Sequence, residues 1–216
     1  DNLLGGLGKI WHVGEVEFKL VPTCYIFHTA IAGISKIIEE QRINPDDINK
    51  ISVKGDPLMQ TPNRMGREIK SFADAQFSNA YNFALAAYYG SRPSPAWQMP
   101  STFSDPRIKR LMSKVMVESH PQFDEFATNR IKAGKIPVMW SSLVEVVANG
   151  KTFTMEVSAP RGSRDNPATE TELIDKFRTN ASYSIVKTGK GDELTETIGH
   201  LEEIDDVCKL FTLLTL

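Results

Sequence analysis

The stretch VEFKLVPTCYIFHTAIAG, residues 16–33, decides how the chain begins to fold. An alternating run up to Val21 predicts a strand. Pro22 then opens a helix, because proline is favoured in a first helical turn, where its missing N–H costs nothing. The apolar residues that follow recur at helical spacing; they are Phe27, Ala30, Ile31, Ile34, Ile37 and Ile38. Lys19 is therefore expected at a strand end, a few residues before a helix N-terminus.

Lys19 is the candidate functional residue that this arrangement singles out. A helix N-terminus carries a partial positive charge and several unpaired N–H groups. A lysine beside it makes a pocket for a carboxylate or a phosphate. The alternative is an ordinary solvated lysine, since most lysines are exposed.

Composition describes an ordinary globular chain. It has 216 residues, 41% hydrophobic and 24% charged, with a net charge of −2. Because no long basic run occurs, we expect no nucleic-acid partner. The two cysteines, Cys24 and Cys208, fit a reducing compartment. No apolar run approaches the roughly 20 residues that span a bilayer, so we expect a cytoplasmic protein without membrane contact. The start, DNLLGGLG, suggests a fragment or a processed piece.

Hydrophobic periodicity predicts the remaining elements. The expected strands cover residues 10–21, 48–54 and 115–119, with a hairpin of residues 138–148 and 151–159 around Asn149-Gly150. The expected helices cover residues 22–40, 71–89, 106–113, 170–181 and 193–214, and a capping box at Thr169-Glu170-Thr171-Glu172 opens the fourth of them. Residues 121–137 are compatible with a helical turn or a long loop. This order predicts an α+β fold: a small mixed or antiparallel sheet covered by helices, followed by C-terminal helices.

Four further side chains are candidates for binding a substrate. Cys24 is either a pocket wall or a small buried thiol at a helix start. His28 lies one helical turn beyond Cys24 and is either catalytic or a core histidine with its hydrogen bonds satisfied. Arg64 lies in a polar loop and could bind a carboxylate bidentately, or be solvated. Ser78 shares a helix face with Tyr81, and both either reach a substrate or pack the helix.

Known signatures of metal and nucleotide sites are absent from the sequence. No Cys/His cluster has metal-ligand spacing. There is no P-loop, no G-x-G-x-x-G and no G-x-S-x-G sequence. We therefore expect no metal.

Three stretches together resemble the MmgE/PrpD family, which includes 2-methylcitrate dehydratase, cis-aconitate decarboxylase and iminodisuccinate epimerase. FKLVPTCYIFHTAI resembles a lysine segment leading into a helix, and FSNAYNFALAAYYG resembles a serine–tyrosine helix that ends in glycine. NPATETELIDKFRTNA resembles a late helix with an acidic start and a Lys-Phe-Arg end. Each motif is degenerate, so their joint order and spacing carry the resemblance.

The resemblance covers only the C-terminal half of such a protein. It implies that residues 1–165 form the smaller α+β domain and that residues 166–216 are helices that pack on an absent all-helical domain. Lys19 matches the family's active-site lysine. Cys24 falls where cis-aconitate decarboxylases have an active-site histidine, which argues against that type of decarboxylation.

The implied chemistry is that of a lyase without a cofactor, acting on a di- or tricarboxylic acid. A proton is removed next to a carboxylate and water is eliminated, as in a 2-methylcitrate dehydratase. The alternatives are an isomerase or epimerase of the same family, or a ligand- or partner-binding module without catalysis. The implied partners are a small carboxylic acid, the N-terminal helical half and a second copy of the protein in a homo-oligomer.

Overall fold

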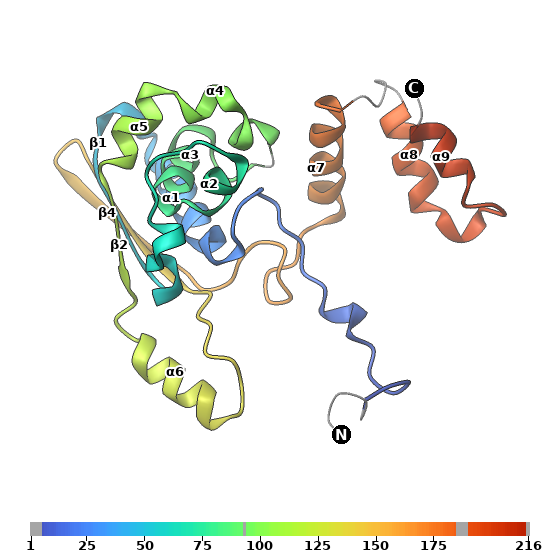
Figure 1. The fold of residues 1–216 in the computed structure, drawn as a ribbon, viewed down its shortest axis with the longest axis horizontal. Coiled ribbons are helices and arrows are strands. Elements are labelled where there is room, and N and C mark those ends of the chain that lie inside the picture. The colour runs from blue at the N-terminus through green and yellow to red at the C-terminus, as the bar shows by residue number, and fades with distance from the viewer. Residues whose placement is uncertain (1–5, 93, 185–189, 215–216) are drawn as a thin grey trace.

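The computed structural model describes residues 6–92, 94–184 and 190–214 of the chain. It has a four-stranded mixed sheet with helices packed on one face, and further helices at one side of this body (Figure 1). The predicted α+β fold is confirmed. The strands are β1 (Ile48–Gly55), β2 (Val115–Ser119), β3 (Ser142–Ala148) and β4 (Lys151–Val157).

The sheet has the order β2-β1-β3-β4. β1 runs parallel to β2 and antiparallel to β3, and β3 and β4 form an antiparallel hairpin. The predicted Asn149-Gly150 turn joins this hairpin, and both residues have the positive φ that a type I′ turn requires. Residues of β3 alternate between buried and half-buried positions, so the sheet presents one face to the core.

The helices divide into a body and a C-terminal group. Those of the body are α1 (His28–Gln41), α2 (Phe72–Phe77), α3 (Asn79–Tyr89), α4 (Pro100–Phe103), α5 (Pro106–Met112) and α6 (Phe123–Lys132). The C-terminal group consists of α7 (Glu170–Ser182), α8 (Lys190–Gly199) and α9 (Lys209–Leu214). In Figure 1 the C-terminal group stands beside the body.

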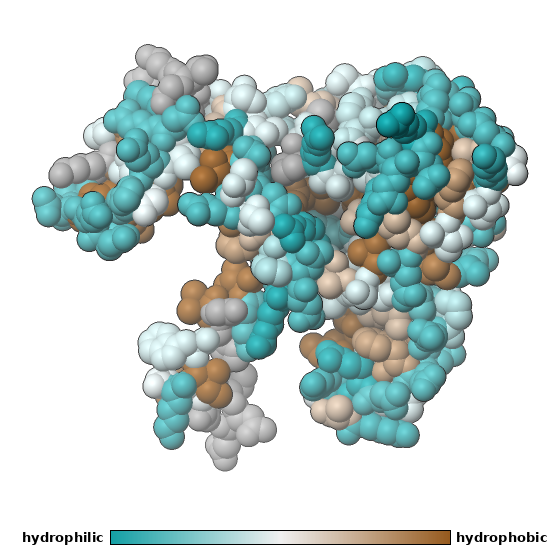
Figure 2. Space-filling view, turned by 180° about the vertical axis from the view of Figure 1, so that it is seen from behind, coloured by the Kyte–Doolittle hydropathy of each residue, from teal (hydrophilic) through white to brown (hydrophobic). Residues whose placement is uncertain are grey.

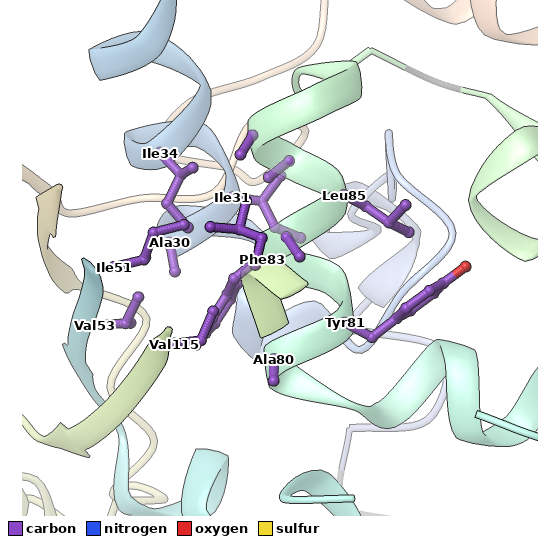
Figure 3. Packing of buried hydrophobic residues seen from close by; sticks show 14 of the residues in the cluster. Ala30, Ile31, Ile34, Ile51, Val53, Ala80, Tyr81, Phe83, Leu85 and Val115 are labelled. Carbon is purple, nitrogen blue, oxygen red and sulfur yellow. The ribbon is translucent and has the colours of Figure 1, made fainter. Parts of the chain in front are cut away.

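The core lies between α1, α3 and the sheet. Figure 3 shows Ile31 of α1 and Phe83 of α3 in a cluster with Ile51 of β1, all of them fully or almost fully buried. α1 lies so close to β3 that a Cβ on Gly33 would come within 2.9 Å of a methyl group of Val144. This packing fixes the start of α1, where the candidate residues Cys24 and His28 lie.

The predicted strand over residues 10–21 is wrong. This segment holds a short 3-10 turn at His12–Glu15 and is otherwise irregular, and within the described part of the chain it pairs with no strand. Alternation alone cannot supply a neighbouring strand for hydrogen bonding. Most apolar side chains of this segment are consequently exposed, whereas Leu20 and Val21 are buried; the exposed ones are Ile10, Trp11, Val13, Val16 and Phe18. Figure 2 shows the N-terminal part of the chain as an arm that stands away from the body.

Helix boundaries also differ from the expected ones. The first helix begins at His28 rather than Pro22, after a 3-10 turn at Tyr25–Phe27. The expected helix over 71–89 is interrupted at Ser78, whose extended backbone separates α2 from α3. The expected helix over 193–214 is split into α8 and α9. The ambiguous residues 121–137 contain α6.

Candidate functional site

The site is built around an extended strap, residues 16–21, which carries Lys19. Leu20 and Val21 are buried, whereas Lys19 is exposed. The strap is held by a hydrogen bond from the Phe18 N–H to the Gly162 carbonyl at 2.9 Å. Gly162 has φ +93°, and a Cβ there would lie 2.1 Å from the Phe18 carbonyl oxygen. Only glycine allows this close approach of strap and loop.

Helix α7 lies against the strap and adds a second lysine. Lys176 donates a hydrogen bond from Nζ to the carbonyl oxygen of Lys19 at 2.5 Å. The helix is tied to the same loop by Arg161, whose Nε and Nη2 donate to Glu172 at 2.9 and 2.6 Å. A bidentate pair of this kind fixes orientation as well as position.

Glu172 also completes the capping box of α7 that the sequence predicts. Its side chain accepts from the Thr169 N–H at 2.8 Å, while the Thr169 hydroxyl accepts from the Glu172 N–H. The hydrogen bond from Arg161, followed by that from the Thr169 backbone, lowers the pKa of Glu172 from 4.5 to about 2. Glu172 is therefore held as a carboxylate by four donors, namely Nε and Nη2 of Arg161 and the N–H and hydroxyl of Thr169.

A cleft of about 380 Å³ opens beside Lys19, and we call it the Lys19 cleft. Its lining is Lys19, Leu20, Val21, Pro22, Thr23, Gln76, Ser94, Pro95, Gln98, Lys176 and Asn180. Among these lining residues two are lysines and none is an aspartate or a glutamate. The remaining polar groups are amides and hydroxyls, so the lining is suited to an anion with several oxygen atoms.

A larger cavity of about 540 Å³, the His28 cavity, shares Leu20 and Val21 with the Lys19 cleft. Its other lining residues are His28, Ile31, Ala32, Ser91, Arg92, Arg161, Glu172, Asp175, Arg178 and Thr179. The strap therefore borders both spaces, with α7 contributing to each.

His28 is a buried histidine whose hydrogen bonds are not satisfied. Its side chain is 5% exposed, and within the described residues Nε2 has no hydrogen-bond partner. Burial, and next the charge of Lys19, lower its pKa from 6.5 to about 4. A hydrogen bond to the backbone of Thr23 acts in the opposite direction, and the charge of Lys176 adds to the lowering. The ring is therefore neutral at neutral pH.

Tyr25 packs on His28, and its hydroxyl is likewise buried and has a shifted pKa. The two ring centroids lie 4.8 Å apart, and the buried Tyr25 hydroxyl lies beside Glu17 and Ser163 without a hydrogen bond of good geometry among the described residues. Burial, and next the charge of Glu17, raise the pKa of Tyr25. Five buried side-chain atoms lack a hydrogen-bond partner in the described chain, and those of Tyr25, His28 and Ser163 belong to this one region. Native proteins rarely leave such groups unpaired, so a concentration of them calls for an explanation.

Cys24 lies outside both spaces. It is half-buried against the hydrophobic core, and its N–H donates to the carbonyl of Gln76 at 3.1 Å. It does not line the Lys19 cleft or the His28 cavity. The geometry favours the reading of Cys24 as a thiol that packs at a helix start.

Ser78 and Arg64 are engaged elsewhere. The Ser78 hydroxyl donates to the Gly66 carbonyl at 2.6 Å and accepts from the Tyr81 N–H, so it caps α3. Arg64 donates from Nη1 to the Thr61 hydroxyl at 2.6 Å, within its own loop. Neither residue lines the Lys19 cleft or the His28 cavity. Tyr81 is fully buried and hydrogen-bonded to Trp97 and Thr102.

The described residues hold neither a metal-binding cluster nor a membrane-spanning helix. No group of three His, Cys, Asp or Glu side chains in that part of the chain could hold a metal ion. None of the helices found there is long and apolar enough to cross a bilayer.

Sequence reasoning missed the contribution of α7 to the site. Lys176 and Asn180 belong to the stretch NPATETELIDKFRTNA, which carries one of the family-like motifs. The signal was present in the Lys-Phe-Arg end, but the contact of Lys176 with Lys19 spans 157 positions of the chain. Periodicity within one helix does not reveal which distant segment it meets.

Comparison with known proteins gives one family and several relatives. The family model described as MmgE/PrpD C-terminal domain matches residues 21–198. A cis-aconitate decarboxylase of Aspergillus terreus (strain NIH 2624 / FGSC A1156) is 24% identical over 229 residues, covering 99% of this chain and 43% of the relative. The cis-aconitate decarboxylase of Homo sapiens is 25% identical over 204 residues, covering 93% and 40%. The chain thus spans about two-fifths of the length of these curated relatives.

Proposed function

This chain belongs to the MmgE/PrpD family, whose C-terminal domain it contains, and we propose from that premise that it forms part of a lyase acting on a di- or tricarboxylic acid. The proposed reaction removes a proton next to a carboxylate and eliminates water. The relatives are named decarboxylases, and decarboxylases are a class of lyases. The substrate and the reaction type are the proposal.

The Lys19 cleft is the observation that supports this proposal most strongly. Two lysines from separate elements, Lys19 on the strap and Lys176 on α7, line one space whose lining includes no aspartate or glutamate. Because like charges repel, two lysines side by side favour an anionic ligand between them. The amides of Gln76, Gln98 and Asn180 supply further donors for carboxylate or hydroxyl oxygens.

The proposed chemistry makes use of this fixed positive charge. Removing a proton beside a carboxylate spreads negative charge onto the carboxylate oxygens. An ammonium held beside those oxygens stabilises the charge as it develops, and this does not require a cofactor. Lys19 is assigned this role, with Lys176 holding the strap and adding a second positive charge. We assign no role in it to Ser78 and Arg64, whose side chains are hydrogen-bonded elsewhere, or to Cys24, which packs against the core.

Decarboxylation is the second candidate reaction, because the relatives compared above are named cis-aconitate decarboxylases. By the family resemblance, Cys24 stands where that activity has a histidine, which argues against decarboxylation of that type. Product analysis separates the candidates: a new double bond with released water indicates a dehydratase, and carbon dioxide indicates a decarboxylase. An inverted stereocentre without change of mass indicates an epimerase.

We also propose that a helical half and a second copy complete the molecule. The chain covers about two-fifths of its relatives, and apolar side chains are exposed at both ends of the described chain. Those in the C-terminal helices and the connection between them include Ile198, Leu201, Val207 and Phe211. The proposed division places residues 166–216, with α7 to α9, in the helical domain.

Substitution of Lys19 in the complete protein that carries this chain tests the proposed function. Lys19→Met is expected to lower turnover of the acid substrate by about a hundredfold or more, since one charge-stabilising donor typically contributes that much. Its melting temperature should stay close to wild type, because Lys19 is exposed. Lys36→Met is the matched control, since Lys36 makes only a surface pair with Glu40. Equal turnover in the two variants would remove Lys19 from the mechanism.

A further inference from the structure

We propose that His28 and Tyr25 are the base and the acid of the elimination, and this inference rests on the proposed function above. The geometry points to a proton acceptor and a proton donor in ring contact, with His28 on the wall of the His28 cavity, which borders the Lys19 cleft at Leu20 and Val21. Neither role follows from the family resemblance, which assigns Lys19 and the position of Cys24.

The first observation is the pairing of the two rings. Their centroids lie 4.8 Å apart at an angle of 55°, and Tyr25 is held from its other side by the edge of Trp140 at 5.2 Å. Both reactive atoms, His28 Nε2 and the Tyr25 hydroxyl, are buried and make no hydrogen bond in the described chain. A core histidine kept only for packing would have its ring nitrogens satisfied.

The second observation is the position of the pair. His28 lines the 540 Å³ cavity. Besides burial, the charges of Lys19 and Lys176, which line the neighbouring cleft, lower the pKa of its ring. Both reactive atoms are buried. Glu17 on the strap and Ser163 in the loop around Gly162 lie beside the Tyr25 hydroxyl. Catalytic hydrogen bonds commonly form only in the complex, and the imidazole turns about a soft torsion.

The third observation concerns the protonation states. Burial lowers the pKa of His28 to about 4 and raises that of Tyr25, so at neutral pH the first is an unprotonated base and the second a protonated acid. The charged groups that face them are Lys19 and Glu17 on the strap and Lys176 on α7.

The proposed elimination begins at the carbon next to the carboxylate. The C–H bond next to the carboxylate breaks, its proton passes to His28 Nε2, and its electron pair moves into that carboxylate. The pair then forms the carbon–carbon double bond as the bond to the β-hydroxyl breaks, and that hydroxyl takes the Tyr25 proton and leaves as water. The proton on His28 returns to the Tyr25 oxygen, which restores both groups.

Tyr25→Phe in the complete protein gives the sharpest test. This variant removes only a hydroxyl that has no partner, so the melting temperature should stay the same or rise. Turnover should fall by about a hundredfold, within the range of general acid catalysis, while the substrate still binds. Tyr81→Phe is the matched control. Its hydroxyl is bonded to Trp97 and Thr102, so this variant should lose stability and keep turnover.

His28→Asn and the smaller change His28→Gln test the base. Either folded variant should lose turnover and also the exchange of the substrate C–H for deuterium in D₂O, which needs only the base. Substrate affinity should stay within about threefold of wild type, unlike that of Lys19→Met. A fall of less than about tenfold in Tyr25→Phe or in a folded His28 variant overturns the pair. If the His28 or Tyr25 variant stays active while Lys19→Met is inactive, the base and acid assignment fails and the proposed function stands. If Lys19→Met is fully active, the proposed function itself fails.

Discussion

Tyr25 and Tyr81 are chemically identical residues that the fold treats in opposite ways. The Tyr81 hydroxyl hydrogen-bonds to Trp97 and Thr102, at 3.0 and 2.8 Å, and locks the core. The Tyr25 hydroxyl is equally closed off from solvent and has no partner. An unpaired buried group costs stability, so its presence next to His28 marks this region as one shaped by something other than packing.

Ser78 is predicted to be a structural residue. Ser78→Ala removes the N-cap of α3 and leaves the carbonyl of Gly66 without its donor, so it should cost about 1–2 kcal/mol of unfolding free energy. Urea unfolding measures this loss. The affinity of the complete protein for its acid substrate should be unchanged. A large drop in affinity with unchanged stability would instead place Ser78 in the binding site.

Glu172 should make a stabilising contribution that depends on pH. Its pKa is lowered from 4.5 to about 2, mainly by Arg161, so the contribution is present above pH 4.5 and is lost as pH falls toward 2. Glu172→Gln keeps a capping acceptor and removes the charge. Because the pair is partly exposed, the loss near neutral pH should be at most about 1 kcal/mol. Thermal melts should show the two proteins converging on acidification; a constant gap would contradict this.

At the scale of elements, local chemistry predicted some segments and tertiary contacts decided the others. Asn149-Gly150 and the Thr169 capping box act within a few residues, and both appear as expected. The alternation of residues 10–21 carries no information about a pairing partner, and the segment forms no strand. Ser78 reads as one more helical residue until its side chain is seen to cap α3. The Lys19 cleft needs α7, which approaches from 157 positions away.

The contact between the strap and the Gly162 loop should be essential for the site. Gly162→Ala places a methyl group against the Phe18 carbonyl at a positive φ, and should cost roughly 2 kcal/mol or more. Gly134→Ala is the control, because Gly134 also has a positive φ but open space around it, and should cost about 1 kcal/mol. Equal losses of stability and equal substrate affinity in the two variants would contradict the role of the strap.

At the scale of the whole molecule, the described chain leaves a large amount of apolar surface uncovered. The exposed residues of the N-terminal arm include Ile10 and Trp11, and those of the C-terminal group include Phe211. Such surface usually marks an interface. The chain spans about two-fifths of the length of its curated relatives, and we propose that the helical half covers this surface.

The isolated 216-residue chain should therefore associate with itself. Light scattering after size exclusion should give a mass above that of one chain, and co-expression with the helical half should replace this association by a defined complex. A stable monomer that binds no hydrophobic dye would show that the exposed surface needs no partner.

Calorimetric titration of the complete protein with citrate, a tricarboxylate, tests the central claim most directly, because that claim is an anion site formed by Lys19 and Lys176. We predict one binding event per chain that weakens with added salt, is lost in Lys19→Met and in Lys176→Met, and is unchanged in Lys36→Met. Citrate binding that is the same in all three variants would contradict the claim.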